Sequence, residues 1–416
     1  MRADIFFSIC QTVVDGFMPD ERQMFQNFFS QVELADRLGF GTAWVAETHL
    51  SCEVQKGNPG AVIPHFQGEI GLNTDILQLA ARVFARTDSI MVGSAIRNII
   101  CNGGPLAHAE AVKTFLTLHG LDPAEKRRLH LGFAAGRFPF SNIPYGYVPR
   151  NAMEEVAWPV VKGRIFREAT TIFLRALRGD RFSSADLPEQ VLVEEDFRTA
   201  EHWQEARAAW LREHPDQDAA GAIPLAPRWE FPTVGVIPVE SPLDLLELVI
   251  GSHDPQVQIL ANSILPCGVF NLSITPSATI EETHQRMEKA FHPDGGGWRR
   301  SRMPRTALIF LNGDEALSME QRSAAATAAA RSALSNYWRA MEGTLDEDKV
   351  NAAVHNALVG NSMEVVRQIR EKYHPGDRLM LWFDFNNHDN PAICRSMECF
   401  SREVLPQLQV EEKGDG

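Results

Sequence analysis

Short apolar runs alternate with longer amphipathic segments from the start of the chain. Four of these runs have the length and composition of buried strands, and they lie at 3–9, 41–47, 89–96 and 129–136. In the segment after each run, apolar residues recur every three or four positions, which predicts a helix packed on one face. These helices are expected at 24–40, 73–85, 105–119 and 159–179. The alternation predicts a parallel sheet with helices outside it.

The alternation stops at residue 183 and resumes near residue 229. The segment 183–228 is charged, contains a helical stretch and has no buried-strand pattern. We interpret this segment as an insertion within one domain rather than as a separate domain. The run 229–239 is expected to be a strand or an extended segment outside the main series.

The remaining chain repeats the earlier pattern. Further strands are predicted at 246–252, 268–274, 305–313 and 377–385, with helices at 255–264, 278–291, 315–341 and 391–404. Eight strands with helices between them predict a (β/α)8 barrel over residues 1–410, with the insertion lying over it. A doubly wound sheet is the alternative fold, but the chain has neither a G-x-G-x-x-G motif nor a P-loop. The tail, 411–416, is predicted to be disordered.

Composition narrows the class of partner. The chain has 416 residues, of which 44% are hydrophobic, and its formal net charge is −14. Without a basic tract, this charge disfavours nucleic acid and anionic lipid and favours a small-molecule substrate. No apolar stretch has the length of a membrane span, and the first residues do not have the pattern of a signal peptide. The six cysteines contain no C-x-x-C pair, which favours reduced thiols and a cytoplasmic location.

In a (β/α)8 barrel the active site lies at the carboxyl ends of the strands. The polar residues that follow the second strand are Glu47, Thr48 and His49. Further candidates follow the third strand at 95–98, the fourth at 134–137 and the fifth at 251–253. The polar end of "GTAWVAETHL" therefore falls where such a barrel places its chemistry. The histidines lack the spacing of metal ligands, so no metal site is predicted.

Several of these segments together resemble the bacterial luciferase-like flavin oxidoreductases. The resemblance rests on "ADRLGFGTAWVAETHL", "IMVGSAI" with "PLAHAEAVKTFLTLHG", "RLHLGFAAG", "LVIGSHDP", and "NALVGNSMEVVRQI" with "CFSREVLPQL". It covers most of residues 3–180 and 229–408, and it does not cover the insertion. The family implies a barrel that binds reduced FMN, or the deazaflavin F420, across its mouth.

The resemblance assigns catalytic candidates to the end of the second strand. His49 corresponds to a family histidine near the flavin ring, and Glu47 is expected to orient it. The family often has two adjacent histidines, and the luciferases use the first for catalysis, where this chain has Thr48. Because threonine cannot shuttle a proton as imidazole does near neutral pH, His49 either inherits that task or only packs.

The resemblance also assigns cofactor-binding candidates. Ser252, with Gly251 and His253, precedes a helix with Pro255 in its first turn, so we interpret Ser252 as its capping serine. Such a helix start binds anions and suits a flavin phosphate, although a cap without a ligand is the alternative. Ala95 and Ile96 match the family's non-prolyl cis peptide, and Asn98 is a candidate for hydrogen bonding to the flavin edge. Ala135 stands where the luciferases have an arginine, and Arg137 is a candidate phosphate ligand from a shifted position.

Together these features predict an FMNH2-dependent monooxygenase that is supplied by a separate flavin reductase and oxygenates a small organic substrate. An F420-dependent hydride-transfer enzyme and a non-catalytic flavin-binding barrel are the alternatives. FMN is favoured because Arg137 is the only cation we can suggest near Ser252, which is too few for a polyanionic tail. The resemblance implies a homodimer that pairs through the helices at 73–85 and 105–119, and both helices carry more apolar residues than one core-facing stripe needs.

Overall fold

The computed structural model of the chain describes residues 1–58, 65–136, 138–216 and 221–408. Two predictions fall outside these residues, namely the role of Arg137 and the disorder of the tail at 411–416. None of the described helices combines the length and apolar character needed to cross a membrane.

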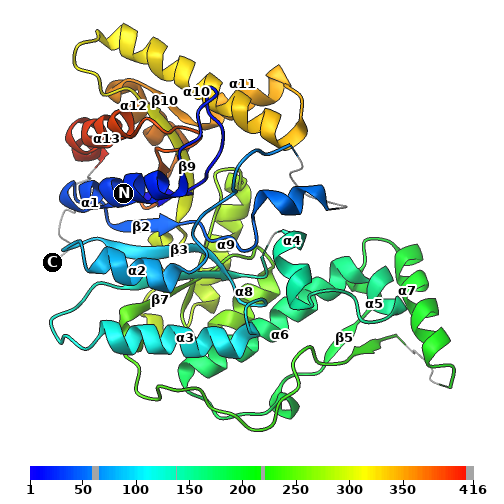
Figure 1. Cartoon of the computed structure of the whole chain (residues 1–416). Coiled ribbons are helices and arrows are strands. Elements are labelled where there is room, and N and C mark those ends of the chain that lie inside the picture. Colours follow the sequence, from blue (N-terminus) through cyan, green and yellow to red (C-terminus); the bar gives the residue numbers. More distant parts are fainter. Residues whose placement is uncertain (59–64, 137, 217–220, 409–416) are drawn as a thin grey trace.

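The core of the molecule is a curled sheet of parallel strands surrounded by helices (Figure 1). Eight strands form the barrel: β1 (Arg2–Phe7), β2 (Thr42–Val45), β3 (Met91–Asn98), β4 (Leu129–Ala134), β7 (Leu246–Ile250), β8 (Cys267–Val269), β9 (Arg305–Leu311) and β11 (Arg378–Trp382). Neighbours pair in parallel from β9 through β11 and β1 round to β8. A parallel bridge between Asn271 and Arg305 joins the two ends. The predicted (β/α)8 fold is confirmed.

The helices expected between the strands are present. They are α1 (Glu21–Arg37), α2 (Ile76–Phe84), α3 (Gly104–His119), α6 (Trp158–Arg178), α8 (Pro255–Asn262), α9 (Ser277–Ala290), α10 (Met319–Glu342) and α13 (Asn390–Cys399). The helix α6 ends where Gly179 adopts a left-handed conformation, which leaves its last carbonyls accessible to the N–H groups that follow. A π-helical turn, Phe400–Val404, and the short α14 (Leu405–Leu408) follow α13.

The segment before the last barrel strand is more complex than the sequence pattern indicates. After α10 come α11 (Glu347–Asn356), a ninth parallel strand β10 (Leu358–Gly360) and α12 (Ser362–Lys372). The strand β10 pairs with the carboxyl half of β9, while β11 pairs with its amino half. Three residues are too short a run to stand out as an apolar pattern, so β10 was not predicted.

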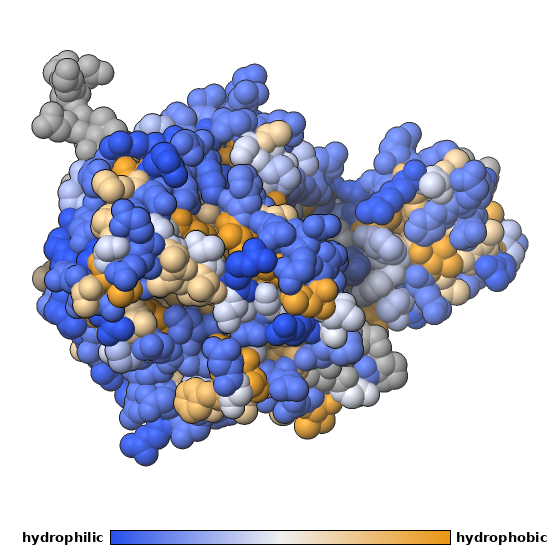
Figure 2. Space-filling model, turned by 90° about the horizontal axis from the view of Figure 1, so that it is seen from above, coloured by the Kyte–Doolittle hydropathy of each residue, from blue (hydrophilic) through white to orange (hydrophobic). Residues whose placement is uncertain are grey.

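Residues 183–228 form a small unit at the side of the barrel. It contains the antiparallel pair β5 (Gln190–Leu192) and β6 (Ile223–Leu225), which the sequence pattern did not predict, and the helix α7 (Ala200–Glu213). The helix α7 packs on α5 (Ala152–Val156), which lies between β4 and α6. Figure 1 shows α5, α7 and β5 projecting from one side, and Figure 2 shows the same side as a lobe. In the run 229–239, the one strand contact within the described residues is a single bridge between Phe182 and Val234.

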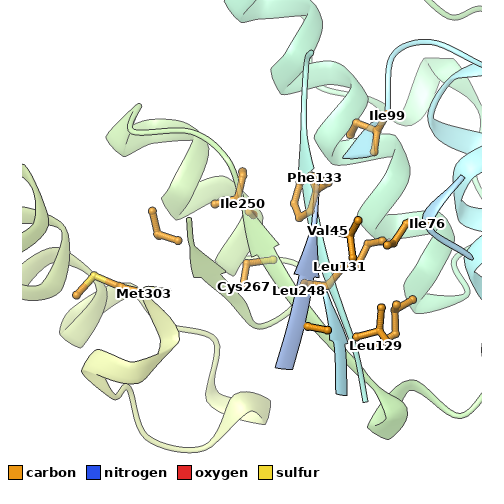
Figure 3. Packing of buried hydrophobic residues seen from close by; sticks show 14 of the residues in the cluster. Val45, Ile76, Ile99, Leu129, Leu131, Phe133, Leu248, Ile250, Cys267 and Met303 are labelled. Carbon is orange, nitrogen blue, oxygen red and sulfur yellow. The ribbon is translucent and has the colours of Figure 1, made fainter. Parts of the chain in front are cut away.

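Alternate residues of the strands face opposite sides of the barrel wall. Outward residues such as Leu131, Phe133, Leu248 and Ile250 pack against the helices in the main core (Figure 3). Inward residues form a second cluster of Phe6, Trp44, Val249, Phe270 and Met380. The Trp44 ring fits because a Cβ on Gly93 would lie 2.5 Å from it.

Below this aromatic layer the barrel interior is ionic. Nε1 of Trp44 donates to the Asp4 carboxylate at 2.7 Å, and Arg378 pairs with the same carboxylate at 2.5 Å. The closely packed aromatic layer above these charges fills the interior of the barrel with side chains. The space open to a ligand is therefore at the carboxyl ends of the strands rather than inside the barrel.

Candidate active site

The carboxylate of Glu47, directly after β2, is fully buried and has three partners. Its Oε2 accepts a hydrogen bond from the backbone N–H of Ile76, at the start of α2, at 3.0 Å. The guanidinium of Arg97, on β3, lies 3.3 Å from Oε2, and Nε2 of His49 lies 3.1 Å from Oε1. A buried carboxylate needs such compensation, because removal from water strongly disfavours an unpaired charge. The predicted pairing of Glu47 with His49 is therefore present.

Both ring nitrogens of the buried His49 have protein partners. Nδ1 lies 2.9 Å from the side-chain nitrogen of Asn102, which can only donate a hydrogen bond. Nδ1 must therefore be the acceptor, and the proton on Nε2 points to Glu47. The neighbouring Thr48, which replaces a family histidine, donates from its hydroxyl to the carbonyl of Gly71 at 2.9 Å.

The network extends to Arg97, which lies in the candidate range 95–98 but was given no role there, and to His108, which the sequence analysis missed. Nε of Arg97 donates to Nδ1 of His108 at 2.9 Å, and Nε2 of His108 donates to the carbonyl of Cys101 at 2.8 Å. Burial, reinforced by the charge of Arg97, lowers the pKa of His108 to about 3, so this ring is neutral. Arg97 is the only charged residue of β3, and a charge inside such an apolar run is the signal that could have identified it.

Ala95 and Ile96 are joined by a cis peptide bond, as the resemblance implied. Both side chains are half-buried and pack on the inner aromatic cluster together with Ala46 and Trp382. These residues come from the ends of β2, β3 and β11, and they form a partly exposed apolar surface at the mouth of the barrel.

The side chain of Asn98 is buried and bonded within the protein. Its nitrogen donates to Oδ1 of Asn142 at 2.7 Å, and its oxygen accepts from the backbone N–H of Ile100 at 3.1 Å. The observed contacts of Asn98 thus fix the loop after β4, and its predicted bond to a flavin edge stays untested.

A pocket of about 440 Å³ lies between the ends of β4 and β7 and the first turns of α6. It brings together three of the predicted cofactor-binding residues, Ala135, Gly251 and Ser252. A Cβ on Gly251 would lie 2.5 Å from Cδ1 of Ile96, so a larger residue here would displace the Ile96 side chain. The other walls include Tyr147, Val148, Trp158, Lys162, Gly163 and Phe166.

The structure corrects the role of Ser252 at the start of α8. The N-cap is Asp254, whose carboxylate accepts from the N–H of Gln256 at 2.8 Å. Ser252 lies two residues earlier, and its Oγ accepts from the N–H of Asp254 at 3.2 Å. Its hydroxyl hydrogen is not used in this bond and remains available to a ligand in the pocket. His253 is exposed and is not among the residues that line the pocket.

Lys162 corrects the expectation that Arg137 is the only cation near Ser252, because it lines the same pocket. The sequence search followed strand ends, whereas Lys162 comes from the face of a helix. The hydroxyl of Tyr147 donates to the backbone carbonyl of Lys162 at 3.3 Å and ties this turn of α6 to the pocket wall.

The outer wall of the pocket is anchored by the segment that follows the insertion. Arg228 donates to the backbone carbonyl of Val148 at 2.9 Å and also to that of Gly146. In the opposite direction, Arg150 donates to the carbonyl of Ala226 at 2.8 Å. These reciprocal bonds hold the wall around 146–148 against residues 226–228.

Comparison with known proteins gives one family. The model of the luciferase-like monooxygenases matches residues 4–225. Monooxygenase RslO1 from Streptomyces bottropensis has a TM-score of 0.65 at 17% identity, covering 98% of this chain and 100% of its own. The oxygenating constituent of 3,6-diketocamphane monooxygenase from Pseudomonas putida, in complex with FMN, has a TM-score of 0.55 at 14% identity, covering 99% of both chains. DmoA from Hyphomicrobium sulfonivorans has a TM-score of 0.55 at 11% identity, covering 98% of this chain and 87% of its own.

No curated protein matches the chain at a significant level. At these identities the solved structures support the barrel fold alone. The family match is stronger evidence, because it covers more than half of the 416 residues and includes the ends of β2, β3 and β4. This chain belongs to the luciferase-like monooxygenase family.

Proposed function

We propose that the protein is a monooxygenase that uses reduced FMN, supplied by a separate flavin reductase, and O2 to oxygenate a small organic substrate. The observation that carries this proposal is the pocket that combines Ser252 and Lys162 beside an apolar surface at the barrel mouth. Support also comes from the 3,6-diketocamphane enzyme, which is described as an oxygenating constituent in complex with FMN.

The described residues fit the two halves of FMN. The phosphate would be held by the hydroxyl of Ser252 and the ammonium of Lys162, because a charged donor and a hydroxyl are good partners for an anion. The flat ring would lie on the apolar surface formed by Ala46, Ala95, Ile96 and Trp382. When bound, the reduced flavin supplies the oxygen-activating chemistry. The protein supplies orientation, exclusion of water and control of protons.

Within this proposal Glu47 is a positioning residue and His49 is the proton-handling group. Glu47 holds the Nε2 edge of the ring, so Nδ1 is the nitrogen that could exchange a proton. Nδ1 is bonded to Asn102, and that contact must open before His49 can act. Ala95, Asn98 and Ala135 are proposed to lie beside the cofactor without bearing charge.

Two alternatives have specific support. The pocket of about 440 Å³ extends beyond the space of a phosphate and contains a cation, which suits the longer tail of F420. Because Lys162 is a cation in this pocket, a lack of cations no longer favours FMN over F420. A flavin-binding barrel without turnover is favoured by the complete hydrogen bonding of His49 and by Thr48.

Titration of the purified protein with FMN and F420, followed by oxygen consumption after flavin reduction, tests these alternatives. The proposal expects FMN binding in the micromolar range or tighter, with oxygen uptake that depends on added substrate. Preference for F420 without oxygen uptake would support hydride transfer instead. FMN binding without turnover of any of a panel of small organic substrates would support the non-catalytic barrel.

We also propose that the protein forms a homodimer in the cytoplasm, and α3 is the better supported contact. In α2 the large apolar side chains are buried within the chain, so the expected surplus is not found there. In α3 the side chain of Leu118 is 63% exposed. All six cysteines are free thiols, which suits the proposed location.

A further inference from the structure

The hydrogen-bond contacts of His49 are joined into a cyclic network by His108. In one half of the network, Nε2 of His49 lies 3.1 Å from the Glu47 carboxylate, which lies 3.3 Å from the guanidinium of Arg97. Nε of Arg97 in turn donates to Nδ1 of His108 at 2.9 Å. In the other half, Nδ1 of His49 accepts from the side chain of Asn102, which lies in a turn that His108 contacts. His108 is therefore linked to both contacts of His49.

The turn between β3 and α3 forms the second half of this network. The backbone carbonyl of Cys101 accepts from Nε2 of His108 at 2.8 Å and from the backbone N–H of Gly104 at 3.0 Å. Asn102 follows with a left-handed φ of 52°, a conformation that is uncommon for residues other than glycine. Such a conformation persists where neighbouring contacts hold it. His108 supplies a side-chain contact of this kind, and so supports the turn from which Asn102 reaches His49.

His108 can serve both halves of the network because its imidazole is neutral. Burial lowers the pKa of His108 to about 3; the charge of Arg97 acts in the same direction, whereas the carboxylate of Asp75 opposes it. A neutral imidazole has one acceptor nitrogen and one N–H donor, which match the N–H of Arg97 and the carbonyl of Cys101. A protonated ring would have two donors and would repel Arg97.

Each half of the network fixes one contact of His49, and the two halves meet at His108. We propose that His108 is a positioning residue that keeps His49 in a single tautomer, with the proton on Nε2 and with Nδ1 as the acceptor. Without His108, Arg97 loses the acceptor for its Nε and the turn at Cys101 loses a donor, so both partners of His49 gain freedom. The effect on turnover rests on the proposed function, in which His49 handles protons, whereas the effect on the tautomer does not.

The tautomer of His49 can be measured in the flavin-free protein. Long-range proton–nitrogen NMR spectra of protein labelled with nitrogen-15 histidine distinguish the two neutral tautomers, and the signals lost in His49→Ala identify His49. His108→Phe keeps an aromatic side chain but removes both bonds, whereas His108→Gln retains one acceptor and one donor in its amide. His119→Phe is the matched control, because His119 also lies on α3 and bonds to a backbone carbonyl, that of Arg127, at 2.9 Å.

We expect the wild type and His119→Phe to contain only the Nε2–H tautomer of His49. His108→Phe should contain both tautomers, and His108→Gln should restore the wild-type signals. Substrate-dependent oxygen uptake at saturating reduced FMN should fall by about tenfold or more in His108→Phe, because a misplaced or wrongly protonated imidazole is a poor proton acceptor. The affinity for FMN, measured by flavin fluorescence, should change less than about twofold.

If His108→Phe does not fold, His108→Asn replaces it. Its shorter amide can meet Arg97 but does not extend to the Cys101 carbonyl, which the imidazole contacts through its far nitrogen. His108→Asn should therefore also contain both tautomers of His49.

A single Nε2–H tautomer in His108→Phe or His108→Asn would overturn the role of His108 while leaving the monooxygenase proposal intact. Both tautomers in the wild type, in His119→Phe or in His108→Gln would overturn it as well. The expected tautomers without oxygen uptake for any of a panel of small organic substrates would instead overturn the proposed function and leave the positioning role in place.

Discussion

The side-chain nitrogen of Asn102 lies 2.9 Å from Nδ1 of His49 and 3.3 Å from Nε2, the ring nitrogen that also contacts Glu47. Asn102 holds this position from a left-handed backbone conformation two residues before the start of α3, with a φ of 52°. The imidazole is thus fixed between a carboxylate and an amide. Any proton exchange at Nδ1 requires the amide to move away.

Replacement of His49 tests this arrangement. His49→Ala is expected to slow turnover by about 10²–10⁴, which is typical for loss of general acid–base help. FMN affinity should stay within a few-fold, because His49 is not among the residues that line the proposed phosphate pocket. Steady-state kinetics and flavin titration measure the two quantities separately. Unchanged turnover together with a lower melting temperature would assign His49 a packing role.

Ser252→Ala is expected to weaken FMN while leaving riboflavin nearly unchanged. The variant removes one hydroxyl donor to a charged phosphate, a loss of about 1.5–3 kcal/mol. Fluorescence titration with both ligands provides the measurement. Ser263→Ala is the control, because this exposed serine follows α8 and, among the described residues, its hydroxyl donates only to the backbone carbonyl of Leu260. If both ligands weaken equally, the phosphate binds elsewhere.

Arg97→Ala should destabilise the protein strongly. It leaves the buried carboxylate of Glu47 without its cationic partner, and breaking a buried pair in this way costs about 3–5 kcal/mol. Arg86→Ala is the control, since Arg86 and Glu33 form a partly exposed pair worth about 1 kcal/mol or less. Urea unfolding of the flavin-free proteins gives both values. A similar small loss in both variants would contradict a tightly coupled network around Glu47.

The carboxyl group of Asp384, after β11, predicts a pH dependence of stability. Burial raises its pKa from 3.8 to about 7, and its Oδ1 has no hydrogen-bond partner among the described residues. As pH rises above 3.8, the unfolded chain releases this proton while the folded chain keeps it until about pH 7. This group therefore lowers stability as pH increases through that window.

Asp384→Asn should remove this loss, because the amide stays neutral. We expect the variant to melt above the wild type at pH 8 and close to it at pH 4. Thermal melts at both pH values test this expectation. A variant that melts below the wild type at pH 8 would contradict a costly buried charge at Asp384.

The proposed dimer can be tested on α3. Leu118→Glu places a charge on the exposed apolar residue of this helix and should convert a dimer to a monomer. Ile274→Glu is the control, because this side chain is 74% exposed but lies in the loop after β8. Sedimentation at micromolar concentration distinguishes the states. A wild-type monomer, or a dimer that survives Leu118→Glu, would exclude this contact.

The strands and helices of the barrel were predictable because each buried strand is an apolar run and each helix has a one-sided apolar pattern. Elements of three residues, such as β5, β6 and β10, were missed because so short a segment has no period. The side chains that meet at the site are harder to predict, since their partners are distant in sequence. Arg97 meets a carboxylate 50 residues away, and Lys162 reaches the pocket from a helix rather than a strand end.

The N-cap of α8 shows the same limit of prediction from sequence, at the level of single residues. Ser252 is a residue type that often caps helices, but Asp254, two positions later, is the residue whose side chain caps α8. Both residues are good caps, so composition alone does not separate them. The choice depends on where the chain turns after β7, which the sequence does not reveal.

The contact between β8 and β9, which closes the barrel, has fewer backbone hydrogen bonds than the contacts between the other neighbouring strands. In the described part of the chain, Asn271 supplies both backbone bonds across it, from its N–H to Pro304 and from its carbonyl to Thr306. Other neighbours share ladders of three or more paired residues. Amide hydrogens along this seam should consequently exchange with deuterated solvent sooner than those of β1 or β4.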